Sequence, residues 1–390
     1  MLITTNDDLA AFCARQADAP FITVDTEFLR DTTYWPKLCL IQIAGPDEEA
    51  AVDALAEGLD LTPIYDLLTD PDLLKVFHAA RQDMEIFYQR LDGRLPGPIF
   101  DTQVAAMVCG FGEQVGYDTL VRKLTGAKIE KASRFADWSK RPLTEKQLSY
   151  ALADVTHLRE IYRKLRDQLA ESGRARWVDE EMAQITDPAT YHMDPRDAWQ
   201  RLKPKSGDRT YLALLRELAA WREREAQRRN VPRNRILRDE QIQDIAAHAP
   251  RGAQDLARTR GLSSDFAKGR TGEAVLAAVE RALNLPPEER PQSPRKNEAP
   301  PGVAPLVDLL KVLLKAKSES HGVAQKLLAT TTDLEKIAVD DRAEVAALRG
   351  WRYDVFGADA LALKHGRIAL AARGKRVAIV TLDGTEQAAE

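Results

Sequence analysis

The sequence predicts an α/β domain at the N-terminus, followed by smaller all-α units. Over residues 1–172, short apolar runs that favour β-strands alternate with helical patterns. From Asp208 onward the helical periodicity dominates, and a segment with six prolines (residues 285–301) interrupts it. Strands mixed with helices indicate one central sheet with helices packed against it, whereas a purely helical stretch indicates a separate unit.

The individual elements follow from apolar periodicity. Strands are expected at residues 21–24, 38–43, 51–52 and 74–77. Helices of the α/β domain are expected at residues 63–68, 82–91, 101–108 and 144–169. Asp101 and Thr102 precede an apolar helical run, so we expect Asp101 to cap that helix and not to bind a metal.

The helical part contains a weak internal repeat. Helices are expected at residues 211–227, 239–247, 272–283 and 306–317, and a last β-like run covers residues 376–382. At a constant offset of 92 positions, apolar residues match between the two parts, as Ile242 with Leu334 and Ile245 with Ile337. We expect a domain at 1–172, a connecting helical segment at 173–207, a helical domain at 208–284, a proline-rich linker at 285–302 and a second helical domain at 303–385.

Composition limits the class of protein. The 390 residues suit two or three domains, and 44% hydrophobic with 30% charged residues is ordinary for a globular protein. No apolar run approaches the roughly 18 residues of a membrane span. Cys13, Cys39 and Cys109 lie far apart, which disfavours disulfides and thiolate zinc and predicts buried thiols in a cytoplasmic protein. The net charge of −4 means that any nucleic-acid binding depends on local basic patches.

Carboxylates stand where the expected strands and helices end. The first strand ends in Asp25-Thr26-Glu27, and the period of two places both acidic side chains on one face. Asp83 opens a helix, and Tyr150 and Asp154 lie one turn apart on the long helix. Each signal alone also fits a structural role, as a solvated strand end or an acid near a helix N-terminus. Together, four acids fit a site in which two divalent cations clamp a phosphodiester.

These residues carry a resemblance to a known family. Asp25-x-Glu27, Asp83 and Tyr150-x3-Asp154 resemble the three exonuclease motifs of the DEDD superfamily. Ser149 occupies the position where one branch of that superfamily has histidine, so the tyrosine branch is indicated. The stretches FITVDTEFLRDTTYWPKLCLIQIAG and VFHAARQDMEIF are similar to the ribonuclease D family, and WREREAQRRNVPRNRILRDE and GWRYDVFG are similar to HRDC modules.

The resemblance implies a ribonuclease H-like α/β exonuclease domain, with a mixed central sheet flanked by helices, followed by two small all-α HRDC domains. It implies 3′→5′ trimming of RNA, chiefly tRNA precursors, by two-metal-ion hydrolysis that releases 5′-mononucleotides with Mg²⁺ or Mn²⁺ as cofactor. Asp25, Glu27, Asp83 and Asp154 would bind metal. Tyr150 would orient the attacking water or assist its deprotonation.

Two segments are candidates for RNA contacts. Arginines cluster at residues 221–238, and those expected to touch RNA are Arg222, Arg228, Arg229, Arg233 and Arg235. The alternative is a solvated helix whose arginines pair with Glu223 and Glu225. Phe28, with Tyr34 and Trp35, could stack on terminal bases, and core packing is the alternative for Phe28.

Two other functions fit parts of this pattern. A DNA 3′→5′ exonuclease of the same fold would share the acids, and a non-catalytic RNA-binding protein would have lost some of them. The sequence keeps all four acids and Tyr150, which favours an active nuclease. We expect no membrane association and see no need for an obligate protein partner.

Overall fold

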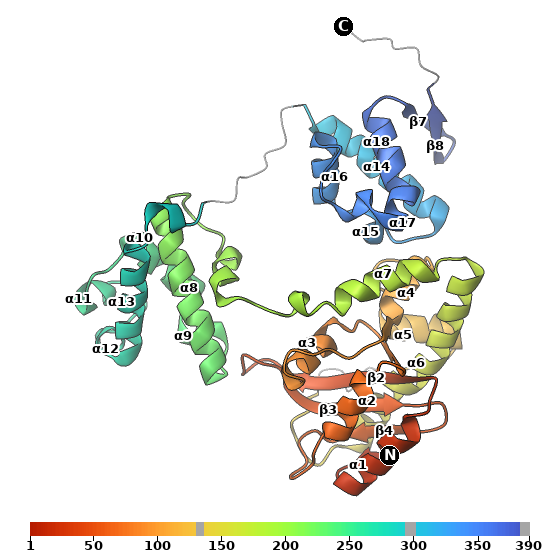
Figure 1. Cartoon of the computed structure of the whole chain (residues 1–390), viewed down its shortest axis with the longest axis horizontal. Helices are drawn as coiled ribbons and strands as arrows, with labels where there is room; N and C mark the ends of the chain where they lie inside the picture. Colours follow the sequence, from red (N-terminus) through yellow and green to blue (C-terminus); the bar gives the residue numbers. More distant parts are fainter. Residues whose placement is uncertain (130–135, 293–301, 383–390) are drawn as a thin grey trace.

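The computed structural model describes residues 1–129, 136–292 and 302–382 (Figure 1). A six-stranded mixed sheet forms the N-terminal domain, in the order β1-β4-β3-β2-β5-β6. Its strands are β1 (Leu2–Ile3), β2 (Phe21–Leu29), β3 (Lys37–Ala44), β4 (Glu49–Val52), β5 (Leu74–Phe77) and β6 (Ile99–Asp101). β2 pairs antiparallel with β3 and parallel with β5. The predicted α/β domain with a mixed central sheet is confirmed.

Helices cover both faces of this sheet. Ile22 and Val24 of β2 join a core with Phe12 of the first helix, whereas Phe21 packs against Tyr162 on the opposite face. The helices of this domain are α1 (Asn6–Gln16), α2 (Thr62–Thr69), α3 (Arg81–Arg90), α4 (Thr102–Val108), α5 (Tyr117–Leu120) and α6 (Glu145–Glu171). Side chains along β2 alternate between two faces of the sheet. One face is apolar and packs against the first helix, and the other meets α6.

The strand that carries the first acids is longer than predicted. We expected it to end in Asp25-Thr26-Glu27, but β2 continues to Leu29, so both acids lie inside it. The backbone of Glu27 still pairs with that of Leu40 on β3, and a bulge follows between Glu27 and Phe28. Backbone pairing with a neighbouring strand does not depend on side-chain polarity, which explains the error. The elements β1, α1 and β6 were likewise not predicted from the sequence.

The long helix α6 begins where its sequence indicates. The Thr144 hydroxyl accepts a hydrogen bond from the backbone nitrogen of Gln147, and the side-chain oxygen of Gln147 accepts one from the backbone nitrogen of Thr144, which is a capping box. Along the helix, Ala151, Val155 and Leu158 are buried at helical spacing. This apolar stripe packs across β2, β3 and β4, and it places the polar members of the same face, among them Asp154, against β2.

The first helical unit has a hydrophobic core of its own. Its helices are α8 (Arg209–Arg229), α9 (Arg233–Ile236), α10 (Asp239–His248), α11 (Ala253–Leu256), α12 (Ser264–Lys268) and α13 (Arg270–Leu283). Trp199 and Leu202, on the 3₁₀ segment η3 (Pro195–Leu202), join this core. The start of the proline-rich segment also packs here, because Arg290 donates to Thr210 at 2.8 Å; the rest of that segment, residues 293–301, lies outside the described residues.

The second helical unit repeats the start of the first. It contains α14 (Ala304–His321), α15 (Gln325–Leu328), α16 (Thr331–Val339), η5 (Ala346–Leu348), α17 (Gly350–Arg352), η6 (Tyr353–Gly357) and α18 (Ala358–Lys364). Three helices of the first unit recur in the second at an offset of 92 positions. This offset relates the last residues of α8 and α14, both ends of α9 and α15, and the first residues of α10 and α16. Asn230 and Gly322, which end the two long helices, both have a left-handed backbone conformation.

The second unit is not all-α, which corrects the prediction. It ends in an antiparallel hairpin of β7 (Ile368–Arg373) and β8 (Arg376–Thr381). The β-like run at residues 376–382 indicated β8, but its partner β7, which lies shortly after α18, was not predicted. A strand without a partner is not stable in water, so this run alone could not establish a sheet.

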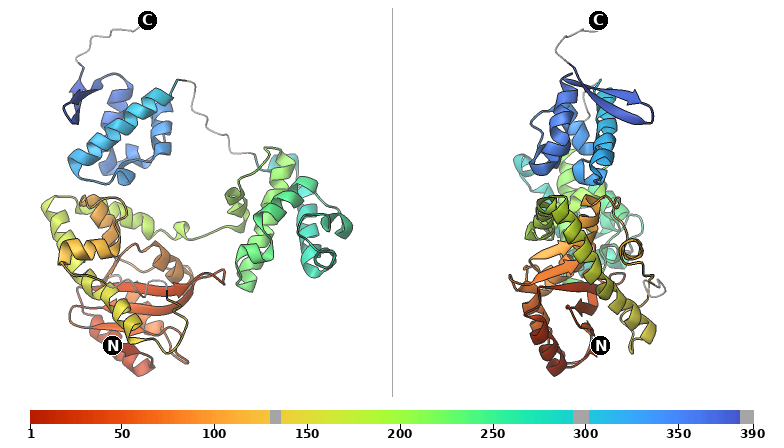
Figure 2. Two further views of the ribbon diagram at one scale, coloured as in Figure 1. Left: turned by 180° about the vertical axis from the view of Figure 1, so that it is seen from behind. Right: turned by 90° about the vertical axis from the view of Figure 1, so that its right-hand side faces the viewer.

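The two helical units lie at different sides of the α/β domain (Figures 1 and 2). α7 (Ala175–Ile185) runs between the α/β domain and the second unit, whose apolar residues form one continuous core with that domain. The tip of the β2–β3 hairpin reaches the first unit at α8 and α9, where Tyr34 bonds to Glu223 and Arg233 (Figure 1). None of the described helices has both the length and the apolar character that spanning a lipid bilayer requires.

Candidate active site

The structure brings the predicted acids together from three elements. Asp25 and Glu27 project from β2, and Asp154 projects from α6. Oxygen atoms of these three carboxylates lie within 4.8 Å of one another. Three carboxylates at this spacing offer the hard oxygen ligands that divalent cations prefer.

Asp83 completes the set from the first turn of α3. Its carboxylate accepts a hydrogen bond from Thr26, the residue between the two acids of β2. The turn before α3 contains Ala79 in the left-handed region, with φ of 61°. Asp101 holds this turn by accepting from the backbone nitrogens of Ala79 at 3.0 Å and Ala80 at 2.8 Å. Asp101 also caps α4, as predicted, so it supports the site and does not belong to the acid cluster.

The acids strongly disfavour one another's ionisation. Burial and the neighbouring Asp154 hold the pKa of Asp25 well above its usual range. Burial and the neighbouring Asp25 do the same to the pKa of Asp83. For Glu27, burial together with Asp25, Asp154 and Asp83 raises the pKa to about 10. A bound cation would relieve this repulsion, because it stabilises the ionised forms.

Tyr150 lies beside these acids, one turn before Asp154 on α6. Its hydroxyl is hydrogen-bonded to Asp154, and its ring lies 6.2 Å from that of Trp138. Burial and the negative charges of Asp154, Glu27 and Asp25 hold its pKa above the ordinary value for tyrosine. The phenol therefore stays protonated and can donate a hydrogen bond at this position.

The cavity at this site has lining residues that were not predicted from the sequence. A cavity of about 310 Å³ is bordered by Asp25, Asp154, Tyr150, His78 and Tyr117. The hydroxyl of Tyr117 donates to the backbone oxygen of Ala153 at 3.0 Å, and its ring lies 5.4 Å from that of His78. His78 contacts Thr102 through Nδ1 at 3.0 Å, which gives its ring a structural role at the end of β5. No sequence signal marks Tyr117, because its partners lie in distant segments.

The predicted RNA-binding arginines fall into different environments. The side chain of Arg222 is 5% exposed and bonds to the Leu237 carbonyl and to Asp239. This position corrects the expectation that Arg222 touches RNA. Arg233 is paired with the fully buried Glu223. The arginines that do face solvent are Arg228, Arg229 and Arg235.

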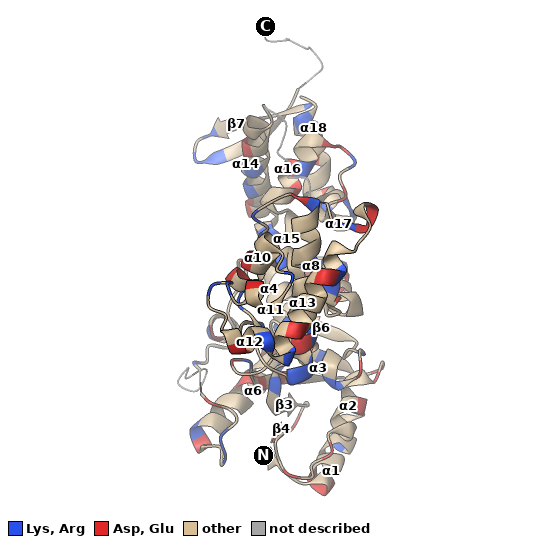
Figure 3. Cartoon of the chain, turned by 90° about the vertical axis from the view of Figure 1, so that its left-hand side faces the viewer, with Lys and Arg blue, Asp and Glu red and all other residues tan. Residues whose placement is uncertain are grey.

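Some exposed arginines fit the alternative of a charged, solvated helix. Arg228 and Arg229 both bond to Glu225, Arg228 at 2.8 Å. Figure 3 shows basic and acidic residues interspersed over that side of the molecule. Phe28 is half-buried against the core, with the Arg30 guanidinium 5.8 Å from its ring.

The family comparisons define the class of protein. The family model of the 3′-5′ exonuclease matches residues 1–170, and that of the HRDC domain matches residues 211–279. The matched ranges contain the acid cluster and the first helical unit. The chain is therefore a 3′→5′ exonuclease with an HRDC domain, and this class implies the use of divalent metal ions, which the acid cluster fits.

Full-length relatives identify the family. Ribonuclease D of Granulibacter bethesdensis is 55% identical over 381 residues, which cover 97% of this chain and 96% of the relative. Ribonuclease D of Acidiphilium cryptum is 53% identical over 382 residues and 98% of this chain. The crystal structure of Escherichia coli RNase D, an exoribonuclease involved in structured RNA processing, matches with a TM-score of 0.82 and 31% identity, over 94% of this chain and 98% of that one. The chain belongs to the ribonuclease D family and is a 3′→5′ exoribonuclease.

Proposed function

We propose that Asp25, Glu27, Asp83 and Asp154 bind two divalent ions, Mg²⁺ or Mn²⁺, and that the site releases 5′-mononucleotides. The observation that carries this is the convergence of three carboxylates within 4.8 Å, with Asp83 held next to them through Thr26. Bound ions would stabilise charge on the attacking and leaving oxygens of the phosphodiester. Asp25, Glu27 and Asp154 would hold one ion, and Asp25 and Asp83 would hold the other.

The remaining side chains act on water and on the RNA end. Tyr150 keeps its proton and orients the attacking water through its hydroxyl, next to Asp154. Glu27 contacts the terminal 3′-hydroxyl, which restricts cleavage to RNA ends. The cavity beside Asp25 and Tyr150 offers room for a nucleotide at the site.

The proposed substrates are RNAs with a structured body and a single-stranded 3′ end, tRNA precursors above all. The Escherichia coli relative is involved in structured RNA processing. In this chain, solvent-facing arginines at the end of α8 and on α9 supply charges for phosphate contacts. We assign Arg228, Arg229 and Arg235 to this role, and retain Phe28 for base stacking only through the exposed part of its ring.

We propose that the second helical unit is a divergent HRDC domain. The support is the repeated spacing from α8–α10 to α14–α16 and the left-handed residue that ends both long helices. The proposed domain bounds are those predicted from the sequence, with η3 added to the first unit because Trp199 packs in its core. Three cysteine thiols without disulfides fit a reducing cytoplasm.

The decisive experiment compares a 5′-labelled tRNA precursor with DNA of matched sequence. We expect a ladder of products shortened from the 3′ end on RNA with Mg²⁺ or Mn²⁺, and no products with EDTA. Arg228→Gln combined with Arg235→Gln should weaken binding to the precursor and flatten its salt dependence, because fewer counterions are released. Equal degradation with and without EDTA would reject the metal site.

A further inference from the structure

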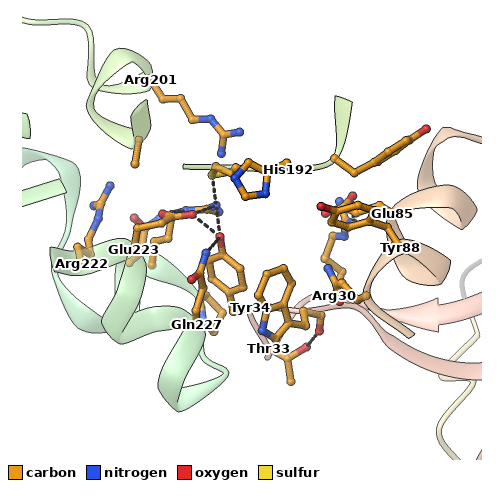
Figure 4. Close-up of a pocket in the computed structure, with 18 of the residues that line it drawn as sticks. Arg30, Thr33, Tyr34, Glu85, Tyr88, His192, Arg201, Arg222, Glu223 and Gln227 are labelled. Atoms are coloured by element: carbon orange, nitrogen blue, oxygen red, sulfur yellow. Dashed lines mark hydrogen bonds and ion pairs between the residues drawn. The ribbon is translucent and has the colours of Figure 1, made fainter. Parts of the chain in front are cut away.

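The tip of the β2–β3 hairpin inserts into the first helical unit. Tyr34 at this tip borders a cavity of about 810 Å³ between the exonuclease domain and that unit. Figure 4 shows Tyr34 beside Glu223 and Gln227 of α8, with Arg30, Glu85 and Tyr88 on the opposite side. A tyrosine that we expected to stack on RNA bases is instead a contact between two parts of the chain.

The hydroxyl of Tyr34 uses its full hydrogen-bonding capacity. It donates to Glu223 and accepts from Gln227 Nε2 at 3.1 Å and from Arg233 Nη2 at 3.0 Å. A phenol has one donor and two acceptor sites, so none remains free. The Arg233 guanidinium also lies 4.6 Å from the centre of the Tyr34 ring.

The partner of this hydroxyl is a buried carboxylate. The Glu223 side chain has no exposure to solvent and accepts from Arg233 at 2.5 and 2.6 Å. Burial opposes its ionisation, but hydrogen bonds from Arg233 and Tyr34 outweigh burial, and the pKa of Glu223 lies below its usual range. A buried ion pair is stable only while its remaining hydrogen bonds are satisfied, and Tyr34 satisfies one of them.

The neighbouring residue makes a second contact. The backbone nitrogen of Trp35 donates at 3.0 Å to the side chain of Asn230, which ends α8. At the base of the hairpin, Arg30 pairs with Glu85 of α3 at 2.5 Å. The hairpin is thus tied both to the helix that carries Asp83 and to the first helical unit.

We propose that Tyr34 is a positioning residue, which fixes the first helical unit relative to β2 and α3 so that an RNA held by that unit presents its 3′ end to the acids. This inference rests on the proposed RNA grip of the first unit. Its physical basis is that β2, which carries Asp25 and Glu27, runs into the same hairpin. Movement of the first unit would otherwise change the path between the held RNA body and the site.

The test uses the full chain with Tyr34→Phe, which removes the hydroxyl and keeps the ring. Tyr88→Phe is the matched control, because Tyr88 lies across the same cavity and its hydroxyl makes no hydrogen bond within residues 1–129, 136–292 and 302–382. Three properties are measured for each: kcat/KM on a short single-stranded RNA, kcat/KM on a hairpin RNA with a 3′ tail, and small-angle scattering of the free protein. Affinity for the tailed hairpin is measured in Ca²⁺, and circular dichroism reports folding.

Tyr34→Phe should leave trimming of the short RNA unchanged and lower kcat/KM on the tailed hairpin by about ten-fold, as expected for losing a hydrogen bond to a charged group. Its affinity for the tailed hairpin should stay near that of the parent chain, while scattering shows a larger maximum dimension. Glu223→Gln should give the same pattern, and Tyr88→Phe should change none of these values.

Two results separate this inference from the function on which it rests. If Tyr34→Phe trims both RNAs at the parent rate, or if its kcat/KM falls equally on both RNAs, the positioning role is overturned. If the variant with Arg228→Gln and Arg235→Gln keeps the parent affinity for the tailed hairpin, the RNA grip of the first unit is overturned instead.

Discussion

At the scale of single residues, the site combines groups that destabilise one another without a cation. Burial and mutual repulsion raise the pKa values of Asp25, Glu27 and Asp83. The fold holds these carboxylates together through distant contacts, such as the bond from Thr26 to Asp83. The acids are therefore arranged for a ligand and not for the stability of the free protein.

Replacing one acid should abolish activity and spare the fold. Asp25→Asn, Asp83→Asn and Asp154→Asn should each lower the rate of RNA trimming by about 10² or more, because a metal then lacks a ligand. Thermal unfolding in metal-free buffer should stay at the parent temperature or rise, since repulsion is relieved. Glu160→Gln is the control, because it removes an exposed carboxylate from α6, the helix that carries Asp154, but outside the cluster. Near-parent rates in two of the three variants would contradict the assignment.

The raised pKa of Glu27 predicts how stability depends on pH. Its pKa rises from 4.5 to about 10 on folding without metal, so the folded state binds its proton more tightly than the unfolded state. The associated stability is complete below pH 4.5 and is lost as the pH rises toward 10. In EDTA, the melting temperature of the parent chain should fall between about pH 5 and 9, and Glu27→Gln should show a smaller fall. Identical pH profiles for the two proteins would reject this interpretation.

Tyr150→Phe should separate water positioning from metal binding. The ring and its contact with Trp138 remain, and only the hydroxyl next to Asp154 is lost. Turnover should fall by roughly 10²-fold, which is typical for loss of a positioning or proton-transfer group. Calorimetry should show Mn²⁺ binding close to that of the parent chain. A variant with parent turnover would remove Tyr150 from the mechanism.

At the scale of elements, the second helical unit docks on the exonuclease domain through close contacts. Trp351 stacks on Trp177 of α7 with ring centres 4.3 Å apart, and Arg352 pairs with Glu181 of the same helix. The backbone nitrogen of Ala324 donates to the Met107 carbonyl at 3.0 Å. These contacts join α7, α4 and the start of α15 into one packed region.

A glycine makes this approach possible. Gly110 has a φ of +81°, and a Cβ there would lie 2.6 Å from the backbone oxygen of Gly322. Gly110→Ala should therefore destabilise the full chain in urea by about 2–4 kcal/mol, from backbone strain and steric overlap together. Gly58→Ala is the matched control, because Gly58 also has a positive φ of +76° but no atom of the described residues lies within 4 Å of the added Cβ. Equal losses for both variants would mean that docking does not depend on this contact.

At the scale of the whole molecule, the second unit is part of the same core as the catalytic domain. Its apolar residues, among them Val323 and Leu327, are continuous with those of α4 and α7. The sequence predicted the second helical unit as a separate domain at residues 303–385. The structure instead indicates that removal of everything beyond Pro204 exposes an apolar surface that includes Trp177.

A fragment of residues 1–204 should accordingly be less stable than the full chain. The lost contacts bury apolar side chains, and each large one contributes about 1.5–3 kcal/mol when fully buried. We expect a lower melting temperature by circular dichroism and stronger binding of a hydrophobic dye. A fragment that melts at the temperature of the full chain would show that the two parts fold independently.

Local periodicity was enough to predict much of the fold and the site. The period of two along β2 placed Asp25 and Glu27 on one face, and the spacing of four placed Tyr150 beside Asp154. The positions of α6, α8 and α10 followed from their apolar periodicity. These features depend on residues a few positions apart, so they can be read before any tertiary contact is known.

Only the tertiary structure decided which distant residues meet. The arginine cluster gave no sign that Arg222 is buried against Asp239 while Arg235 faces solvent. Tyr34 finds its partner Glu223 at a separation of 189 positions. The hydrophobic core that α4 and α7 share with the second unit likewise joins residues that are far apart in the sequence. Such contacts depend on how complete elements pack against one another, and no local pattern in the chain encodes that choice.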